Sequence, residues 1–270
     1  MHASFKDTYG GYAIVVGASA GIGEAFAKEI AARGINLVLV ARDLDRLEAV
    51  STSLKRQFHI EVQCISLDLA LDDAADKLDQ ATAALDIGLL VLNAAAITAG
   101  AFLKNSYEQE SRLIKFNTLM PAQIAHRIGN RMQRRGRGGM IFVSSLAGAA
   151  PTPFQATYAA TKAYLASLGK ALAFELAQSG IDVSVLAPGM TDTVGLRTTA
   201  NIDYSKMKGV SMMSADDVAK AGLNGLGKRS YIIPGLQNKV SAFVLGLLPQ
   251  SVAIKMVGKM TAGAIDSEAL

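Results

Sequence analysis

The sequence has one cysteine, Cys64, and no tryptophan among its 270 residues. A single cysteine excludes an intramolecular disulfide and a cysteine-based zinc cluster, so a reducing compartment is expected. His2, His59 and His126 are scattered without the spacing of metal ligands, and no metal site is predicted. The net charge is only +4, from 27 Lys and Arg against 23 Asp and Glu, which argues against a dedicated nucleic-acid-binding protein.

Long hydrophobic runs are also missing. A membrane span needs about 20 consecutive apolar residues, and the best run near the end, residues 240–248, stops at Pro249. Residues 1–12 lack the apolar core of a signal peptide. We therefore expect a cytoplasmic protein that reaches a membrane, if at all, by peripheral contact.

What the sequence does contain is an alternation of short apolar runs and segments of helical period. The runs read as strands buried on both faces, because they are apolar continuously rather than at every second residue. Their ranges are 12–16, 37–41, 60–67, 87–92, 140–144, 182–186 and 231–233. Repeated β–α alternation implies right-handed crossovers, and so a doubly wound α/β Rossmann domain with a seven-stranded, mostly parallel sheet flanked by helices.

This domain is predicted to span residues 1–236, with residues 237–270 as a C-terminal helical extension split by Pro249. The longest break in the alternation is 189–213. A loop of that length in a compact domain is typical of a lid or binding loop, so we assign it to the substrate.

A glycine-rich turn joins the first strand to a helix that is apolar on one face. Glycines in that position let the backbone approach a pyrophosphate, which then meets free N–H groups and the positive end of the helix dipole. As an isolated string it is only a tight turn, but its strand–turn–helix context favours a dinucleotide site. The predicted contacts are Gly17, Ser19, Ala20, Gly21, Ile22 and Gly23.

The end of the second strand indicates which dinucleotide is preferred. An acidic residue there would bind the ribose 2′-hydroxyl of NAD, whereas this chain has Arg42, which can pair with a 2′-phosphate. The adjacent Asp43 adds the opposite charge, and Arg42 could also be merely solvated. We predict NADP(H) as the preferred cofactor, with NAD(H) as the alternative.

Tyr158 and Lys162 lie four residues apart in the helical run 155–178, on one helix face. A free phenol has a pKa near 10, and an ammonium within about 6 Å favours the phenolate, so the pair is expected to lower the tyrosine pKa toward neutrality. Ser145 ends the fifth strand at the sheet edge where such folds bind ligands, and its hydroxyl can hold a substrate oxygen.

With these residues in view, the chain resembles the short-chain dehydrogenase/reductase family of classical type, from residue 12 to about residue 235. The matching motifs, in order along the chain, are Gly17-x3-Gly21-x-Gly23, Asp68, Asn93-Ala94-Ala95, Asn117, Ser145 with Tyr158-x3-Lys162, and Pro188-Gly189-x3-Thr193. Six ordered motifs are far more specific than any one of them. A looser likeness points to the branch that reduces hydroxysteroids and long-chain 3-ketoacyl groups.

The resemblance implies roles for these residues. Tyr158 would exchange a proton with the substrate oxygen, Lys162 would hold the nicotinamide ribose, and Asn117 would support a water-linked proton relay. The remaining residues would contact the cofactor: Asp68 and Leu69 beside the adenine, Asn93, Ala94 and Ala95 on the ribose side, and Pro188, Gly189 and Thr193 at the carboxamide. Val16, Leu92 and Ala95 depart from the family pattern, but only at supporting positions.

Two further features have competing interpretations. Five arginines between residues 127 and 137 form a docking face for an acidic carrier protein or an anionic membrane or, more commonly, a solvated helix end. In the tail, a stripe including Val252, Met256 and Met260 turns Lys255 and Lys259 outward. This pattern fits peripheral membrane contact through residues 237–261, but packing against the parent domain or a sister subunit is the more common outcome.

The sequence thus predicts an NADP(H)-dependent oxidoreductase that acts on a carbonyl or secondary alcohol of a small apolar substrate, as a homodimer or homotetramer that does not bind nucleic acid. Two alternatives come from other classes. A catalytically idle NAD(P)-binding regulator would need no serine, tyrosine and lysine set, and a membrane-peripheral scaffold would depend on the tail rather than on chemistry.

Overall fold

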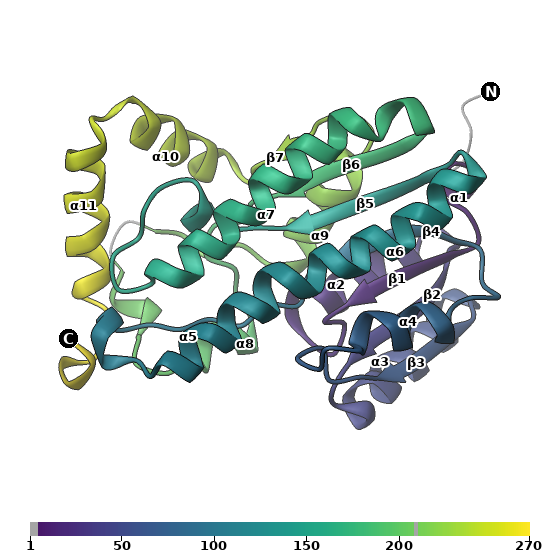
Figure 1. Ribbon diagram of the computed structural model, residues 1–270, viewed down its shortest axis with the longest axis horizontal. Helices are drawn as coiled ribbons and strands as arrows, with labels where there is room; N and C mark the ends of the chain where they lie inside the picture. Colours follow the sequence, from purple (N-terminus) through teal and green to yellow (C-terminus); the bar gives the residue numbers. More distant parts are fainter. Residues whose placement is uncertain (1–4, 208–209) are drawn as a thin grey trace.

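The computed structural model describes residues 5–207 and 210–270. Seven parallel strands form one sheet in the order β3-β2-β1-β4-β5-β6-β7 (Figure 1). This confirms the predicted doubly wound fold. The strands are β1 (Tyr12–Val16), β2 (Asn36–Ala41), β3 (Val62–Ser66), β4 (Ile87–Leu92), β5 (Gly138–Val143), β6 (Ile181–Leu186) and β7 (Tyr231–Ile232).

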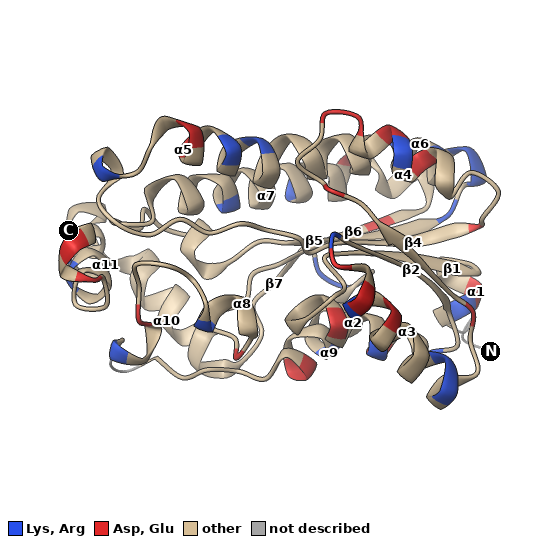
Figure 2. Ribbon diagram, turned by 90° about the horizontal axis from the view of Figure 1, so that it is seen from below, with Lys and Arg blue, Asp and Glu red and all other residues tan. Residues whose placement is uncertain are grey.

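Helices cover both faces of the sheet, which Figure 2 shows edge-on, with α4, α5, α6 and α7 on one side and α2, α3 and α9 on the other. The helices are α1 (Phe5–Tyr9), α2 (Gly21–Ala31), α3 (Leu44–Phe58), α4 (Ala74–Ala81), α5 (Tyr107–Ile114), α6 (Met120–Arg135), α7 (Ala156–Glu175), α8 (Val194–Arg197), α9 (Ala215–Gly225), α10 (Leu236–Leu247) and α11 (Gln250–Ala262). A wide helical turn, Lys115–Leu119, joins α5 to α6.

Alternate residues of the central strands enter two separate cores, because successive side chains of a strand point to opposite faces. Ala13 and Val15 of β1 pack with Phe26 and Ile30 of α2. Ile14 and Val16 pack on the other side with residues of α6 and α7. Burial on both faces is the reason why these strands read as unbroken apolar runs in the sequence.

The strand order reverses between β1 and β4. At this point the chain passes from the half of the sheet formed by β1, β2 and β3 to the half formed by β4, β5, β6 and β7. In folds of this kind, loops diverge at the carboxyl ends of those strands and leave a crevice for a ligand. The glycine turn after β1 and Asn93 after β4 both lie at this edge.

The C-terminal helices fold back onto the same chain. The buried side of α11 includes Ala253 and Val257, and the following Ile265 pairs with Ile202 of the loop between β6 and α9. Figure 1 shows α10 and α11 at the end of the molecule opposite α1. No helix in the described part of the chain combines the length and hydropathy needed to cross a membrane.

The arginine cluster is largely engaged in ion pairs within the fold. Arg127 pairs with Asp76 at 2.6 Å and Arg131 with Asp79 at 3.1 Å, both acids lying in α4. Arg135 and Arg137 share Asp86, at 3.0 and 2.7 Å. Figure 2 shows the two signs of charge side by side on α4 and α6. These pairs favour the solvated-helix-end interpretation over a docking face for an acidic partner.

Candidate active site

A cavity of 1020 Å³ opens at the carboxyl ends of the strands. Its wall combines the glycine turn, the ends of β2, β4, β5 and β6, the start of α7, the loop before α9 and the helices α10 and α11. Sixteen of the residues predicted to form the site line it: Gly17, Ser19, Ala20, Gly21, Ile22, Arg42, Leu69, Asn93, Ala94, Ala95, Ser145, Tyr158, Lys162, Pro188, Gly189 and Thr193.

Two glycines of the turn leave no room for a side chain against the neighbouring backbone. Gly17 has φ of +82°, and a Cβ there would lie 2.9 Å from the backbone of Ala94. A Cβ on Gly23 would lie 1.9 Å from the carbonyl oxygen of Gly17, so Gly23 supports the turn from behind without lining the cavity. The Asn93 amide donates to that same carbonyl at 3.1 Å and ties the end of β4 to the turn.

The first turn of α2 fits an anionic ligand. Its N-cap residue, Ala20, offers no side-chain hydrogen bond to the helix, so the first N–H groups of α2 lack the usual capping partner. Such groups, together with the helix dipole, bind phosphates. The cradle, the uncapped helix and the size of the cavity therefore fit a dinucleotide.

Arg42 lines the cavity and is exposed, and its guanidinium makes no hydrogen bond or ion pair with any described residue. The negative charge of Asp43 is already engaged: its carboxylate accepts from the backbone of Arg46 at 3.1 Å, as the N-cap of α3, and pairs with the Arg46 side chain at 3.1 Å. Asp43 thus forms no ion pair with Arg42. Arg46 also lines the cavity and was missed in the sequence, where its spacing in α3 signals only helix.

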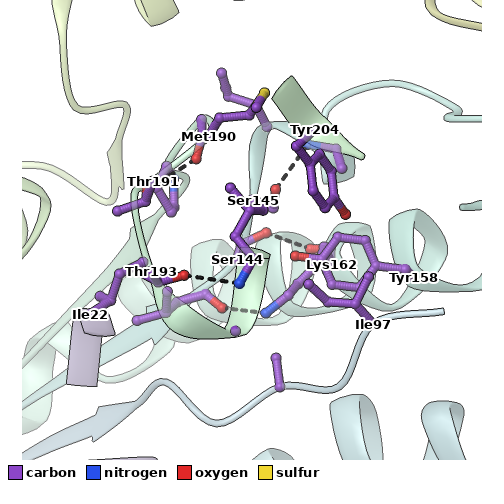
Figure 3. Close-up of a pocket in the computed structure, with 18 of the residues that line it drawn as sticks. Ile22, Ile97, Ser144, Ser145, Tyr158, Lys162, Met190, Thr191, Thr193 and Tyr204 are labelled. Atoms are coloured by element: carbon purple, nitrogen blue, oxygen red, sulfur yellow. Dashed lines mark hydrogen bonds between the residues drawn. The ribbon is translucent and has the colours of Figure 1, made fainter. Parts of the chain in front are cut away.

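The proposed catalytic side chains converge at the floor of the cavity. Figure 3 shows Ser145, Tyr158 and Lys162 close together, with Tyr204 beside them. The Lys162 Nζ atom lies 5.7 Å from the centre of the Tyr158 ring. It donates to the carbonyl oxygen of Val143 at 2.9 Å, and the hydroxyl of Ser145 is hydrogen-bonded to that of Tyr158.

One expectation about this pair is wrong for the structure as it stands. Burial raises the pKa of Tyr158 to about 12, against a smaller lowering by the Ser145 hydrogen bond. Lys162 is not among the groups that shift the Tyr158 pKa, and burial lowers its own pKa to about 8. The four-residue spacing of the pair can be read from the sequence, but the burial of the two side chains cannot. Here burial has a larger effect on the Tyr158 pKa than the expected influence of the lysine charge.

Asn117 and Asp68 lie behind the cavity wall. Asn117 sits in the wide turn between α5 and α6 and is 1% exposed. Its amide bonds the backbone of Ala96 in both directions, at 2.9 Å each, and donates to Thr161 at 3.1 Å. Asp68 accepts from the backbone of Ala70 at 3.0 Å. Both residues therefore shape loops that border the site, while Leu69 itself lines it.

The outer half of the cavity is built mostly from apolar side chains. Its lining includes Met207, Leu245, Val244, Met256 and Met260, the last four from the C-terminal helices. Within the described lining, the charged side chains are Arg42, Asp43, Arg46 and Lys162, on the glycine-turn side and the floor. No cluster of three or more His, Cys, Asp or Glu side chains in the described residues could hold a metal ion.

A polar pair interrupts this apolar half. The amide of Gln155, which is 6% exposed, donates to the hydroxyl of Tyr204 at 2.7 Å. Tyr204 belongs to the predicted substrate loop, and its proximity contributes to the raised pKa of Tyr158. Neither residue was predicted for the site, because no pattern links an N-cap glutamine to a tyrosine 49 positions later.

Comparison with known proteins places these features in context. A profile of the short chain dehydrogenase family matches residues 11–203. A 7β-hydroxysteroid dehydrogenase of Clostridium sardiniense is 32% identical over 258 residues, covering 95% of this chain and 98% of the relative. A very-long-chain 3-oxoacyl-CoA reductase-like protein of Arabidopsis thaliana is 32% identical over 251 residues, which cover 90% of this chain and 79% of the relative.

Solved structures agree with these matches. A 7β-hydroxysteroid dehydrogenase structure superposes with a TM-score of 0.87 at 25% identity, covering 94% of this chain and 99% of the other. A short-chain dehydrogenase of Sphingobium yanoikuyae in complex with NADPH has a TM-score of 0.77 at 29% identity, and the alignment covers 89% of this chain and 96% of the other.

Proposed function

Because the chain belongs to the short-chain dehydrogenase family of NAD(P)-dependent oxidoreductases, we propose that it transfers a hydride between NADP(H) and a carbonyl or secondary alcohol of an apolar substrate. The observation that carries this proposal is the position of Ser145, Tyr158 and Lys162, between the glycine cradle and the apolar half of one cavity. A catalytically idle nucleotide-binding regulator would have no use for this arrangement.

The nicotinamide, when bound, supplies or accepts the hydride at its C4 atom. The chain's own residues handle the proton and the position of the substrate. In the direction of reduction, the Tyr158 hydroxyl donates its proton to the substrate oxygen, and the Ser145 hydroxyl holds that oxygen beside it. Lys162, with its Nζ atom 5.7 Å from the centre of the Tyr158 ring, would hold the nicotinamide ribose beside the reacting groups.

NADP(H) is the proposed cofactor because Arg42 offers an unpaired guanidinium at the end of β2, with Arg46 beside it. A guanidinium binds a phosphate through charge-assisted, often bidentate hydrogen bonds. The engagement of Asp43 by Arg46 removes the main objection to this assignment, and the solved NADPH complex of a 29% identical relative agrees with it.

The proposed substrate is a bulky ketone or alcohol, steroid-like or a long-chain 3-ketoacyl compound. The apolar half of the cavity can accommodate a large hydrocarbon skeleton. The named relatives are a 7β-hydroxysteroid dehydrogenase and a protein described as 3-oxoacyl-CoA reductase-like. The hydrogen-bonded Gln155 and Tyr204 are two of the polar side chains in the lining that could meet a second oxygen of such a molecule.

The test is consumption of NADPH with a panel of steroid, 3-ketoacyl and small aldehyde carbonyls. Tyr158→Phe should lower kcat by about 100- to 10,000-fold while NADPH binding, followed by fluorescence, is retained. The matched control is Tyr164→Phe on the same helix, which lies outside the cavity lining and should keep full activity. Full activity of Tyr158→Phe would remove this tyrosine from the reaction.

A further inference from the structure

Helix α10 presents an apolar stripe to solvent. Leu236 is 77% exposed, Phe243 68% and Leu247 69%, and Val240, at 53%, completes the row. The spacing of four, three and four residues places all of them on one face of the helix. Side chains of this size are rarely left in water side by side unless the patch contacts something.

The segment that carries this stripe has charges of one sign only. Residues 218–265 contain six lysines and arginines and neither aspartate nor glutamate. Three of the cations, Lys239, Lys255 and Lys259, lie on α10 and α11 and are exposed, and none of them forms a salt bridge within the described residues. Lys239 borders the stripe on α10, and two more exposed lysines lie on the next helix. This combination is complementary to an anionic lipid surface, which offers hydrocarbon below and negative headgroups above.

The same two helices form the outer wall of the cavity. Val240 and Val244 of α10 line it, as do Met256 and Met260 of α11. The exposed stripe therefore borders the cavity wall, and Val240 belongs to both.

We propose that the α10–α11 face, made up of the four stripe residues Leu236, Val240, Phe243 and Leu247 and the three lysines Lys239, Lys255 and Lys259, docks peripherally on an anionic lipid bilayer. The apolar side chains enter the boundary between headgroups and acyl chains, and the lysines remain at headgroup level. Docked in this way, the cavity wall lies next to the hydrocarbon, so that a lipid-soluble substrate can enter without crossing bulk water.

A second copy of the chain suits this face less well. A two-fold contact brings the same patch of each subunit together, so the three lysines of one copy would meet those of the other. The face has no acidic side chain with which to compensate them. Lipid phosphates supply that missing charge.

The experiment is co-sedimentation of the full chain with phosphatidylcholine vesicles, with and without phosphatidylglycerol. We expect binding that requires the anionic lipid and weakens as salt is raised. Phe243→Ser with Leu247→Ser should weaken partitioning by about tenfold for each side chain. Lys255→Gln with Lys259→Gln should weaken it by about fivefold for each lysine.

Phe174→Ser is the matched control, because Phe174 is 87% exposed but lies on α7. None of these five residues lines the cavity, so all variants should reduce a water-soluble carbonyl at the wild-type rate. The lipid result and the reductase result are thus separate: binding without turnover would leave the docking proposal standing and remove the proposed function.

Two outcomes would overturn the docking proposal. One is sedimentation that is equal with neutral and anionic vesicles or unchanged in the α10 variant. The other is a dimer in solution that Phe243→Ser with Leu247→Ser converts to a monomer, with no vesicle binding by either form. That second result would assign the stripe to a sister subunit.

Discussion

The side-chain nitrogen of Lys162 donates a hydrogen bond to the main-chain carbonyl of Val143 at 2.9 Å, and Lys162 is 2% exposed. A neutral acceptor compensates only part of the solvation that an ammonium loses on burial. The buried amine therefore disfavours its own charge, and this is why its pKa falls to about 8. The cost of holding a cation at the cavity floor should be measurable as a pH dependence of folding.

Lys162→Met tests this cost. In the unfolded chain the amine titrates at its ordinary value near 10.5, and in the folded chain at about 8. Below pH 8 the folded protein bears the full penalty, and as pH rises toward 10.5 the penalty disappears. The stability of Lys162→Met relative to wild type should therefore fall by about 3 kcal/mol between pH 7 and pH 10.5.

Urea unfolding of both proteins across that range measures the difference. Titration of Tyr158 affects both alike and should cancel to a first approximation. Lys162→Met should also lose reductase activity, but that loss alone would not distinguish the amine's charge from its shape. A stability difference that does not change with pH would contradict the depressed pKa.

Arg42→Ala tests the proposed cofactor preference. Loss of a charge-assisted contact to the 2′-phosphate should weaken NADPH binding by about 10- to 100-fold and leave NADH binding unchanged. Titration calorimetry with both nucleotides gives the ratio. Arg56→Ala is the control, because Arg56 is exposed on α3 but lies outside the cavity lining. An unchanged ratio in Arg42→Ala would return NAD(H) to equal standing.

Gly23→Ala should damage the glycine turn by steric overlap alone. The added methyl group would lie 1.9 Å from the Gly17 carbonyl oxygen, so either α2 or the turn must shift. We expect a loss of about 3 kcal/mol in the free energy of unfolding together with weaker NADPH binding. Gly246→Ala in exposed α10, where a methyl group meets nothing within 4 Å, should instead stabilise by about 0.5–1 kcal/mol. Equal effects of the two substitutions would refute this reasoning.

Asp86→Asn tests the structural interpretation of the arginine cluster. Burial raises the pKa of Asp86, but hydrogen bonds from Arg137 and the backbone of Gly11, with the nearby Arg135, outweigh it and lower the pKa overall. Such a carboxylate stabilises the fold above its unfolded pKa, and this contribution is lost as pH falls through the lowered folded value.

At pH 7, Asp86→Asn should lower Tm by about 2–4 °C. This deficit should shrink in acid, where the wild-type carboxylate is also neutral. The control is Asp72→Asn, an exposed residue that forms no hydrogen bond or salt bridge with any described residue. A deficit that persists at the lowest pH would show that the asparagine disturbs packing rather than removing charge.

The sequence predicted the sheet and the inner half of the site because both depend on local patterns. Continuous apolar runs identified every strand, although β3 is shorter than predicted and β7 has only two residues. Gly17, Asn93 and Ser145 each follow a strand directly, and the strand ends of a parallel sheet meet at one edge. Chain order alone was therefore enough to bring them together.

What the sequence did not predict depends on contacts between distant segments. The partnership of Gln155 with Tyr204 and the placement of Val244 and Met256 in the cavity wall follow from how the tail folds back. The direction in which the Tyr158 pKa shifts likewise depends on how completely the surrounding residues exclude water. Amphipathic stripes in the tail indicated that something covers them, but not that one face of each helix would line the site.

The fold-back of the tail has a consequence for how the molecule can diversify. Residues before α10 supply the cradle, the arginines and the proton-handling side chains, whereas much of the outer wall comes from the last segment of the chain. Exchange of that terminal segment between relatives would change the shape of the substrate-binding part of the cavity. It would not alter the residues proposed to bind the cofactor or to transfer the proton. Recombination near residue 236 would thus change the substrate specificity while the catalytic and cofactor-binding residues stay the same.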